Sequence, residues 1–190
     1  MEVSVSSSSN KLILDLCAGS GAWSAPYKDA GYTVRRIDLK FTNEDVRLFE
    51  SIKNQVYGVL AAPDCTHLSG SGARWWKKKG ERALLEALSI ADACVRIILI
   101  TKPHFWALEN PVGRLRRFYG DPRLIFNPND YGDPYTKKTL LWGDFNLPKK
   151  NQVEPVEGSK MHLLPPSEDR KYLRSITPSG FAYEFFKANQ

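Results

Sequence analysis

Short apolar runs alternate with amphipathic stretches along most of this 190-residue chain. Runs of this length predict buried strands, and we place them at residues 11–16, 32–38, 56–61, 105–108, 124–126 and 139–142. The longest predicted helix covers residues 81–101, because its apolar positions recur at spacings of three and four. Shorter helices are predicted at 23–30, 43–53, 112–118 and 181–188. Strands that alternate with helices in this way predict an α/β domain with a mainly parallel sheet.

Two stretches lack this periodicity. Residues 1–10 are polar and serine-rich, without the basic start and apolar centre of a secretion signal, and predict a flexible arm. Residues 144–176 are rich in proline, lysine and glutamate and predict a short irregular segment. The length and the 42% hydrophobic content suit one domain over residues 11–190. No apolar run approaches the roughly 20 residues of a membrane-spanning helix, so we expect no membrane association.

The cysteines and the charge distribution indicate the redox compartment and the class of partner. Cys17, Cys65 and Cys94 stand in dissimilar contexts that give neither a disulfide framework nor a zinc spacing. We therefore expect a reducing, cytoplasmic location and no metal. The net charge of +6 is clustered, with five basic residues between positions 70 and 82. Such clustering favours a phosphate-bearing partner, although a generally solvated basic surface is the alternative.

Several residues that can carry chemistry directly follow predicted strands. They are the segment 15–21, Asp38, Cys65 and Glu109. In parallel sheets the carboxyl ends of strands share one edge, where ligands bind. We expect these residues to gather there. Cys65 is then a candidate nucleophile, and a buried small residue in a turn is the alternative reading.

A Gly-Ser-Gly turn follows the first strand at residues 19–21. Glycines there let the backbone approach a ligand. Asp38, 17 residues after Gly21, can accept hydrogen bonds from ribose hydroxyls. A dinucleotide fingerprint would have a third glycine, and Trp23 and Ser24 stand in its place. The pattern predicts a nucleoside-containing cofactor, with an ordinary tight turn as the alternative.

The order of these motifs resembles the DNA cytosine-C5 methyltransferase family, in the very short form encoded by phages and prophages. The segments that carry the resemblance are residues 14–21, 38, 44–46, 63–65, 109–111, 134–143 and 177–182. It implies a Rossmann-like, S-adenosylmethionine-dependent methyltransferase fold with a mostly parallel central sheet and helices on both faces. It also implies a phage- or prophage-encoded protein in the cytoplasm of a bacterial host.

The resemblance implies a reaction and roles for individual residues. A methyl group would pass to C5 of a flipped-out cytosine in double-stranded DNA, leaving S-adenosylhomocysteine. Cys65 would attack C6, Glu109 would act as the acid at N3, and Asn110 would orient the loop. Lys138 would take the place of the second arginine in the family's Arg-x-Arg strand.

Binding residues are implied in the same way. Those for S-adenosylmethionine are Asp15, Cys17, Ala18, Gly19, Gly21, Trp23, Asp38, Asp45, Pro63 and Ser179. Those for DNA are Ser69, Arg74, Trp75, Trp76, Lys77, Lys78, Lys79, Arg114 and Lys137. The segment 69–80 is expected to be a flexible loop that closes on DNA; the alternatives are core packing for Trp75 and Trp76 and a solvated helix start for Lys77–Lys79. We expect a monomer, with a dimer as the alternative.

The sequence departs from the family pattern at several places. Cys17 replaces an aromatic residue near the cofactor, for which Trp23 would compensate. Asp64 replaces the proline before the nucleophile, and its carboxylate would raise the pKa of the thiol. The segment 144–176 stands where the family inserts a target-recognition domain, so specificity should be short, relaxed or supplied by the loop 69–80 or by a partner. Two alternatives follow: a catalytically silent protein that binds DNA or cofactor in a regulatory role, and an enzyme acting on RNA or on nucleotide cytosine.

Overall fold

A computed structural model describes residues 11–190 of the chain, and the arm expected at residues 1–10 lies outside the described residues. The described residues form a six-stranded sheet in the order β2-β1-β3-β4-β6-β5. The strands are β1 (Leu12–Leu16), β2 (Thr33–Ile37), β3 (Val56–Ala61), β4 (Phe105–Pro111), β5 (Leu124–Phe126) and β6 (Thr139–Asp144). The first four are parallel, whereas β6 runs antiparallel to β4 and β5. The predicted α/β class with a mainly parallel sheet is confirmed.

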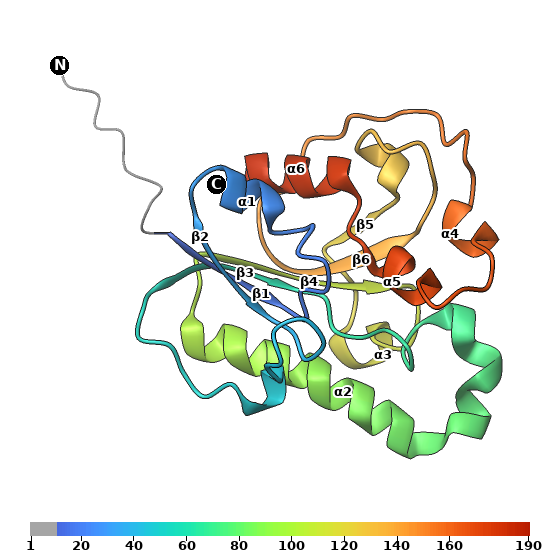
Figure 1. Ribbon diagram of the computed structural model, residues 1–190, viewed down its shortest axis with the longest axis horizontal. Coiled ribbons are helices and arrows are strands. Elements are labelled where there is room, and N and C mark those ends of the chain that lie inside the picture. The colour runs from blue at the N-terminus through green and yellow to red at the C-terminus, as the bar shows by residue number, and fades with distance from the viewer. Residues whose placement is uncertain (1–10) are drawn as a thin grey trace.

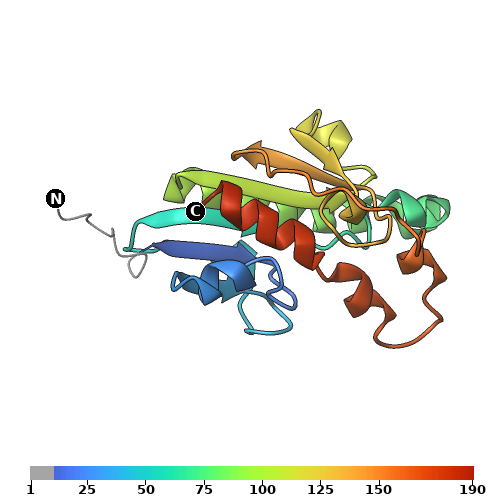
Figure 2. The same cartoon turned by 90° about the horizontal axis from the view of Figure 1, so that it is seen from above.

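Helices cover both faces of the sheet (Figures 1 and 2). Helices α1 (Ala25–Asp29) and α6 (Ser179–Ala188) lie on one face, and α2 (Trp76–Thr101) lies on the other. Successive strand residues point to opposite faces, so Ile13 packs in an aromatic core with α6 while Leu14 packs in an aliphatic core with α2. The Tyr27 hydroxyl of α1 donates to the carbonyl of Asn189, just after α6, at 3.3 Å.

Helix α2 begins earlier than the sequence indicates. A 3₁₀ helix, η3 (Gly70–Trp75), leads directly into α2 at Trp76. Gly80 (φ 74°) kinks α2 near its start, in a left-handed conformation that glycine adopts without strain. The expectation of a flexible loop over 69–80 is therefore wrong: most of this segment is helical.

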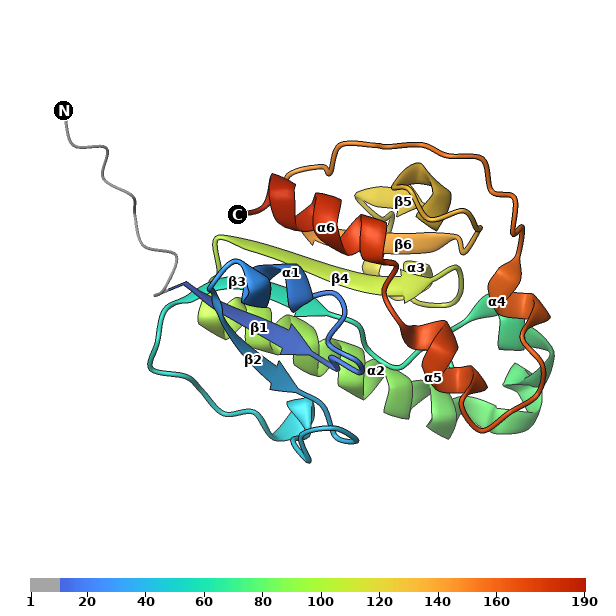
Figure 3. The same cartoon turned by 45° about the horizontal axis from the view of Figure 1, so that its top comes forward.

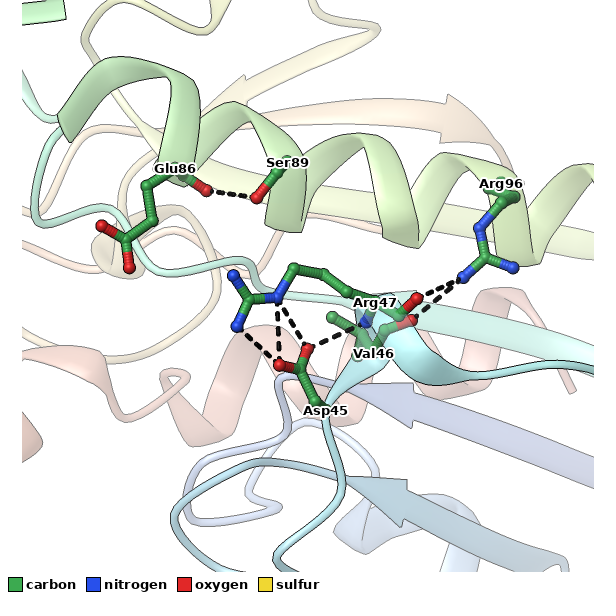
Figure 4. Close-up of polar contacts among 6 residues, drawn as sticks. All are labelled: Asp45, Val46, Arg47, Glu86, Ser89 and Arg96. Carbon is green, nitrogen blue, oxygen red and sulfur yellow. Dashed lines mark hydrogen bonds and ion pairs between the residues drawn. The ribbon is translucent and has the colours of Figure 1, made fainter. Parts of the chain in front are cut away.

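The helix expected at residues 43–53 is also wrong. The structure has only a 3₁₀ turn, η2 (Val46–Leu48), which Asp45 caps by accepting from the Arg47 amide. Arg96 of α2 donates to the carbonyls of Val46, Arg47 and Phe49 at 2.8–3.3 Å, and the first two of these bonds appear in Figure 4. The carbonyls that would accept from backbone amides in a helix thus accept from the side chain of a distant arginine instead.

Two further segments differ in detail from the expectation. Helix α3 (Arg116–Tyr119) is shorter than predicted, because β4 continues to Pro111 and residues 112–114 pair with residues 68–70. The segment 144–176 contains α4 (Lys160–Leu163) and α5 (Arg170–Ser175). Figure 3 shows α5 at the edge towards which the parallel strands point.

No helix within residues 11–190 is long and apolar enough to cross a bilayer. In the same part of the chain, no group of three or more His, Cys, Asp or Glu side chains is arranged to hold a metal ion.

Candidate functional site

The turn after β3 and the end of β4 are fastened together at the carboxyl edge of the sheet. The buried Asn110 amide donates from Nδ2 to the Pro63 carbonyl at 2.9 Å. Beyond them, the Arg114 amide donates to Leu68 and the Gly70 amide donates to Val112, both at 2.8 Å. These bonds hold the loop that carries Cys65 beside the strand end that carries Glu109.

Cys65 lies on the turn after β3 and is partly buried. Burial raises the pKa of its thiol to about 11, and the negative charges of Glu109 and Asp64 act in the same direction. The ammonium of Lys137 acts in the opposite direction. The thiol is therefore protonated near neutral pH, and any nucleophilic role requires removal of its proton.

Glu109 is well placed to keep a proton. Burial raises the pKa of its carboxyl, and the positive charge of Lys137 opposes that rise. Asn110 lies next to it, and its buried Oδ1 has no hydrogen-bond partner among the described residues. A carboxyl with a raised pKa and an unsatisfied carbonyl oxygen thus lie at the strand end beside the loop that carries the thiol, and both can bind the polar edge of a ligand.

The two lysines before β6 are placed differently from the expectation. Lys137, expected to bind DNA, interacts electrostatically with both Cys65 and Glu109. Its Nζ also donates to the Ile176 carbonyl at 3.5 Å. Lys138, expected in the site, is exposed to solvent. Neighbouring side chains of an extended segment point to opposite sides, so only one lysine of the pair can face the thiol.

Asp64 is paired with a residue that sequence reasoning missed. Its Oδ1 accepts from the amide and hydroxyl of Thr66, and its Oδ2 forms an ion pair with Lys171 of α5 at 3.0 Å. Burial alone would raise the pKa of this carboxyl, but the bonds from Thr66 and Lys171 bring it below the ordinary value. Asp64 is therefore ionised and partly neutralised. No sequence signal links it to a lysine 107 residues away.

The glycine turn after β1 bonds to two side chains, Arg36 of β2 and Asp38, which directly follows β2. Gly19 and Gly21 have φ values of 52° and 75°, which glycine tolerates. The Gly19 amide donates to Oδ2 of Asp38 at 2.9 Å, and its carbonyl accepts from Nη2 of Arg36. A Cβ on Gly21 would lie 2.9 Å from Nε of Arg36. Arg36, which sequence reasoning also missed, thus closes one side of the turn.

Open space remains on the other side of the turn. A Cβ added to Gly19 would meet no atom within 4 Å. Oδ1 of Asp38 accepts from the amides of Lys40 and Phe41, whereas within residues 11–190 Oδ2 accepts only from Gly19. Oδ2 therefore keeps an acceptor site for a ligand hydroxyl. Leu39 and Phe41 expose apolar side chains beside it, which suits a nucleoside with a flat base.

Asp15 lies beneath this turn rather than in the open space. It is 1% exposed and accepts a short hydrogen bond from the Ser24 hydroxyl. Burial raises the pKa of its carboxyl to about 7, against the effects of Ser24 and Arg36, and Asp38 adds to the rise. Ala18 accepts from the Gly21 amide at 2.8 Å. Both residues hold the turn in shape.

Other expected cofactor residues have different partners. Trp23 is 3% exposed and packs on Phe185 at a ring-centroid distance of 5.5 Å, so it belongs to the core and does not take the place of the aromatic residue missing at Cys17. Asp45 forms an ion pair with Arg47 (Figure 4). The Ser179 hydroxyl bonds to Asp133 at 3.3 Å. All three side chains thus have partners within the protein.

The expected DNA-binding residues divide into two groups. Arg74, Trp75, Lys77, Lys78 and Lys79 are exposed around the start of α2. Of these Lys79, together with the less exposed Ser69, Trp76 and Arg114, also has a partner within the protein. The Arg114 guanidinium lies 4.0 Å from the ring centroid of Trp76, Lys79 donates to the Thr66 carbonyl at 3.1 Å, and the hydroxyls of Ser69 and Ser71 bond at 2.9 Å. The tandem tryptophans thus separate into one exposed ring and one partly buried ring.

No protein-family model and no curated protein sequence matches this chain. Among solved structures, the chain is similar to an Escherichia coli prophage-encoded protein provisionally described as a DNA modification methyltransferase. The TM-score is 0.52 at 16% sequence identity, over 76% of this chain and 52% of the other. The chain therefore spans about half the length of that protein. At this identity the likeness shows the fold alone, which is the α/β fold of that protein.

Proposed function

We propose that this chain is an S-adenosylmethionine-dependent methyltransferase that acts on C5 of cytosine in double-stranded DNA. The observation that carries the proposal is the fastening of Cys65 beside Glu109 and Asn110, at the sheet edge that also holds the glycine turn and Asp38. The DNA-modification description of the structural neighbour supports DNA as the substrate class. We extend the proposal to a prophage origin and action in the host cytoplasm, as one domain over residues 11–190.

The residues around the glycine turn fit the proposed cofactor. The open space at Gly19 would accept it, the free acceptor site on Asp38 Oδ2 would bind a ribose hydroxyl, and Leu39 and Phe41 would contact the adenine. When bound, S-adenosylmethionine supplies an activated methyl group. Cys17, Ala18 and Gly21 shape the turn, and Asp15 supports it from below.

Cys65 and Glu109 divide the chemistry between them. The deprotonated Cys65 adds to C6 of cytosine, while Glu109 gives a proton or a hydrogen bond to N3 as charge builds there. The pKa of Glu109 is raised by burial, which suits a carboxyl that must hold this proton. This addition makes C5 nucleophilic. Once C5 carries the methyl group, loss of its proton and elimination of the thiolate restore Cys65.

Lys137 takes the role that the sequence suggested for Lys138. Its ammonium lowers the pKa of the Cys65 thiol against the effects of burial and neighbouring carboxylates. It also keeps part of the negative charge on Glu109 compensated. We therefore assign Lys137 to the reaction centre and leave Lys138 as an exposed basic residue.

The exposed residues at the start of α2 form the proposed DNA surface. Arg74, Lys77 and Lys78 would neutralise phosphates. Trp75, 48% exposed with the Arg74 guanidinium 5.4 Å from its ring centroid, would stack on bases left by a flipped cytosine. This surface adjoins the Cys65 loop through the bond from Lys79 to Thr66.

Covalent trapping tests the proposal directly. With S-adenosylmethionine and a duplex containing 5-fluoro-2′-deoxycytidine, we expect a stable adduct at Cys65, because fluorine at C5 blocks the final elimination. Cys65→Ser should give no adduct. Cys94→Ala is the matched control, since Cys94 is a buried thiol in α2, and it should still be trapped. Equal trapping of wild type and Cys65→Ser would refute the assigned nucleophile.

A catalytically silent, cofactor-binding protein is the second candidate. The raised pKa of Cys65 and the adjacent carboxylate of Asp64 favour it. It predicts cofactor binding by calorimetry together with no adduct on DNA. An adduct on 5-fluorocytidine RNA, and none on DNA, would instead move the substrate to RNA.

A further inference from the structure

Helix α5 crosses the carboxyl edge of the sheet and contacts three parts of the candidate site. Lys171 pairs with Asp64 at 3.0 Å. Tyr172 packs against Phe41, which follows Asp38, with ring centroids 5.9 Å apart. Just beyond α5, the Ile176 carbonyl accepts from Lys137 at 3.5 Å. The segment 144–176 is therefore in contact with the nucleophile turn, with the turn after β2 and with the lysine beside Glu109.

The contact at Asp64 bears on the neighbouring cysteine. A carboxylate one residue before a thiol opposes formation of the thiolate, because like charges repel. Asp64 has two sources of compensation: Thr66, which donates hydrogen bonds to Oδ1, and Lys171, which is its ion-pair partner at Oδ2. Of these two, only Lys171 carries a positive charge.

We propose that Lys171 is a positioning residue for Cys65: it neutralises the carboxylate of Asp64 and thereby keeps the adjacent thiol reactive. The effect of Lys171 on the Cys65 thiol does not depend on the proposed function; only the role of that thiol as the nucleophile of a methyltransferase rests on it. The segment 144–176, which stands where a recognition domain was expected, thus supplies part of the electrostatic environment of the nucleophile.

Other charged groups around Cys65 limit the size of the effect. Glu109 from β4 and Lys137 from the segment before β6 both act on the thiol, and Lys79 from α2 bonds to the Thr66 carbonyl. These groups remain when Lys171 is replaced. The side chains of Lys171 and Asp64 are 72% and 46% exposed, and solvent screens such pairs. We therefore expect a change in thiol reactivity of about two- to fivefold.

Alkylation of Cys65 measures this effect without any methyl transfer. The rate of modification by iodoacetamide, read at the Cys65 peptide by mass spectrometry between pH 7 and 10, reports the thiolate fraction. Lys171→Met should slow labelling about two- to fivefold at a fixed pH in this range, and Lys171→Arg should restore it. Lys149→Met is the matched control, because Lys149 is an exposed lysine in the same segment. It should leave the rate unchanged.

The Asp64→Asn background distinguishes an effect of the Lys171 charge on Asp64 from a general effect of Lys171→Met on folding. In that background Lys171→Met should no longer slow labelling, because the carboxylate that Lys171 neutralises is gone. Equal rates for wild type and Lys171→Met would overturn the proposal, as would the same slowing with and without Asp64. A chain that fails to methylate DNA but shows the predicted labelling pattern would refute the proposed function and leave this inference standing.

Discussion

Gly113 lies against the Cys65 loop just after the strand end that carries Glu109. A Cβ added there would lie 2.0 Å from the Leu68 carbonyl oxygen and 2.9 Å from the Gly70 nitrogen. Both are backbone atoms, so no side chain can rotate away. We expect Gly113→Ala to push the two loops apart and to break the bonds from Arg114 to Leu68 and from Gly70 to Val112.

The cost follows from these contacts. Two lost hydrogen bonds contribute about 1 kcal/mol each, and overpacking in a tight site costs about 1–3 kcal/mol. We therefore expect Gly113→Ala to lower the free energy of unfolding by roughly 3–5 kcal/mol. With a urea m-value of about 2 kcal/mol/M, this corresponds to a fall in the midpoint of about 1.5–2.5 M.

Urea unfolding followed by tryptophan fluorescence provides the assay. Gly72→Ala is the matched control, because Gly72 lies in the neighbouring 3₁₀ helix and a Cβ there meets nothing within 4 Å. It should unfold close to the wild-type midpoint. The steric reasoning fails if both variants unfold at the same urea concentration, or if Gly72→Ala is the less stable of the two.

Two further predictions concern the tandem tryptophans and the buried acid. Trp75→Ala should weaken duplex binding about tenfold in a fluorescence-anisotropy titration, through lost stacking, with an unchanged melting temperature. Trp76→Ala should lower the unfolding free energy by about 1–3 kcal/mol, because its ring packs under Arg114; the opposite pattern would reverse the two assignments. Asp15 has its pKa raised from 3.8 to about 7, so as pH rises the unfolded chain loses this proton first and the fold is destabilised between about pH 4 and 7. Asp15→Asn removes that loss, so its stability relative to wild type should increase across this range in urea unfolding, and a difference independent of pH would contradict the raised pKa.

Strands β1 and β3 were predictable because each is a short apolar run buried on both faces. β1 and β3 match their predicted bounds within one residue. Placing Cys65 and Glu109 at one edge then followed from the parallel direction of the strands. The absence of a helix at 43–53 was not predictable, because carbonyls of this segment accept from Arg96, about 50 residues away. The sequence of the segment itself does not indicate that so distant a side chain donates to its carbonyls.

The sequence predicts only those site residues that directly follow a strand. Lys137 rather than Lys138 faces the thiol because of side-chain alternation before β6, and two adjacent lysines look alike in a sequence. Lys171 was missed because a polar segment without periodicity gives no indication of what it contacts. The role expected for Trp23 was wrong for a related reason, because a large aromatic residue near a glycine turn can face either a ligand or the core. In this fold Trp23 faces the core, where it packs against Phe185 of α6.

The pairing of α1 with α6 has a consequence for the order in which the protein can be built. The helix that follows the glycine turn is covered by α6, and Tyr27 bonds to a carbonyl 162 residues downstream. During synthesis β1 and its turn leave the ribosome early, but the aromatic face above them stays uncovered until α6 has emerged. We therefore expect the proposed cofactor pocket to become rigid only after residues 179–189 have been synthesised.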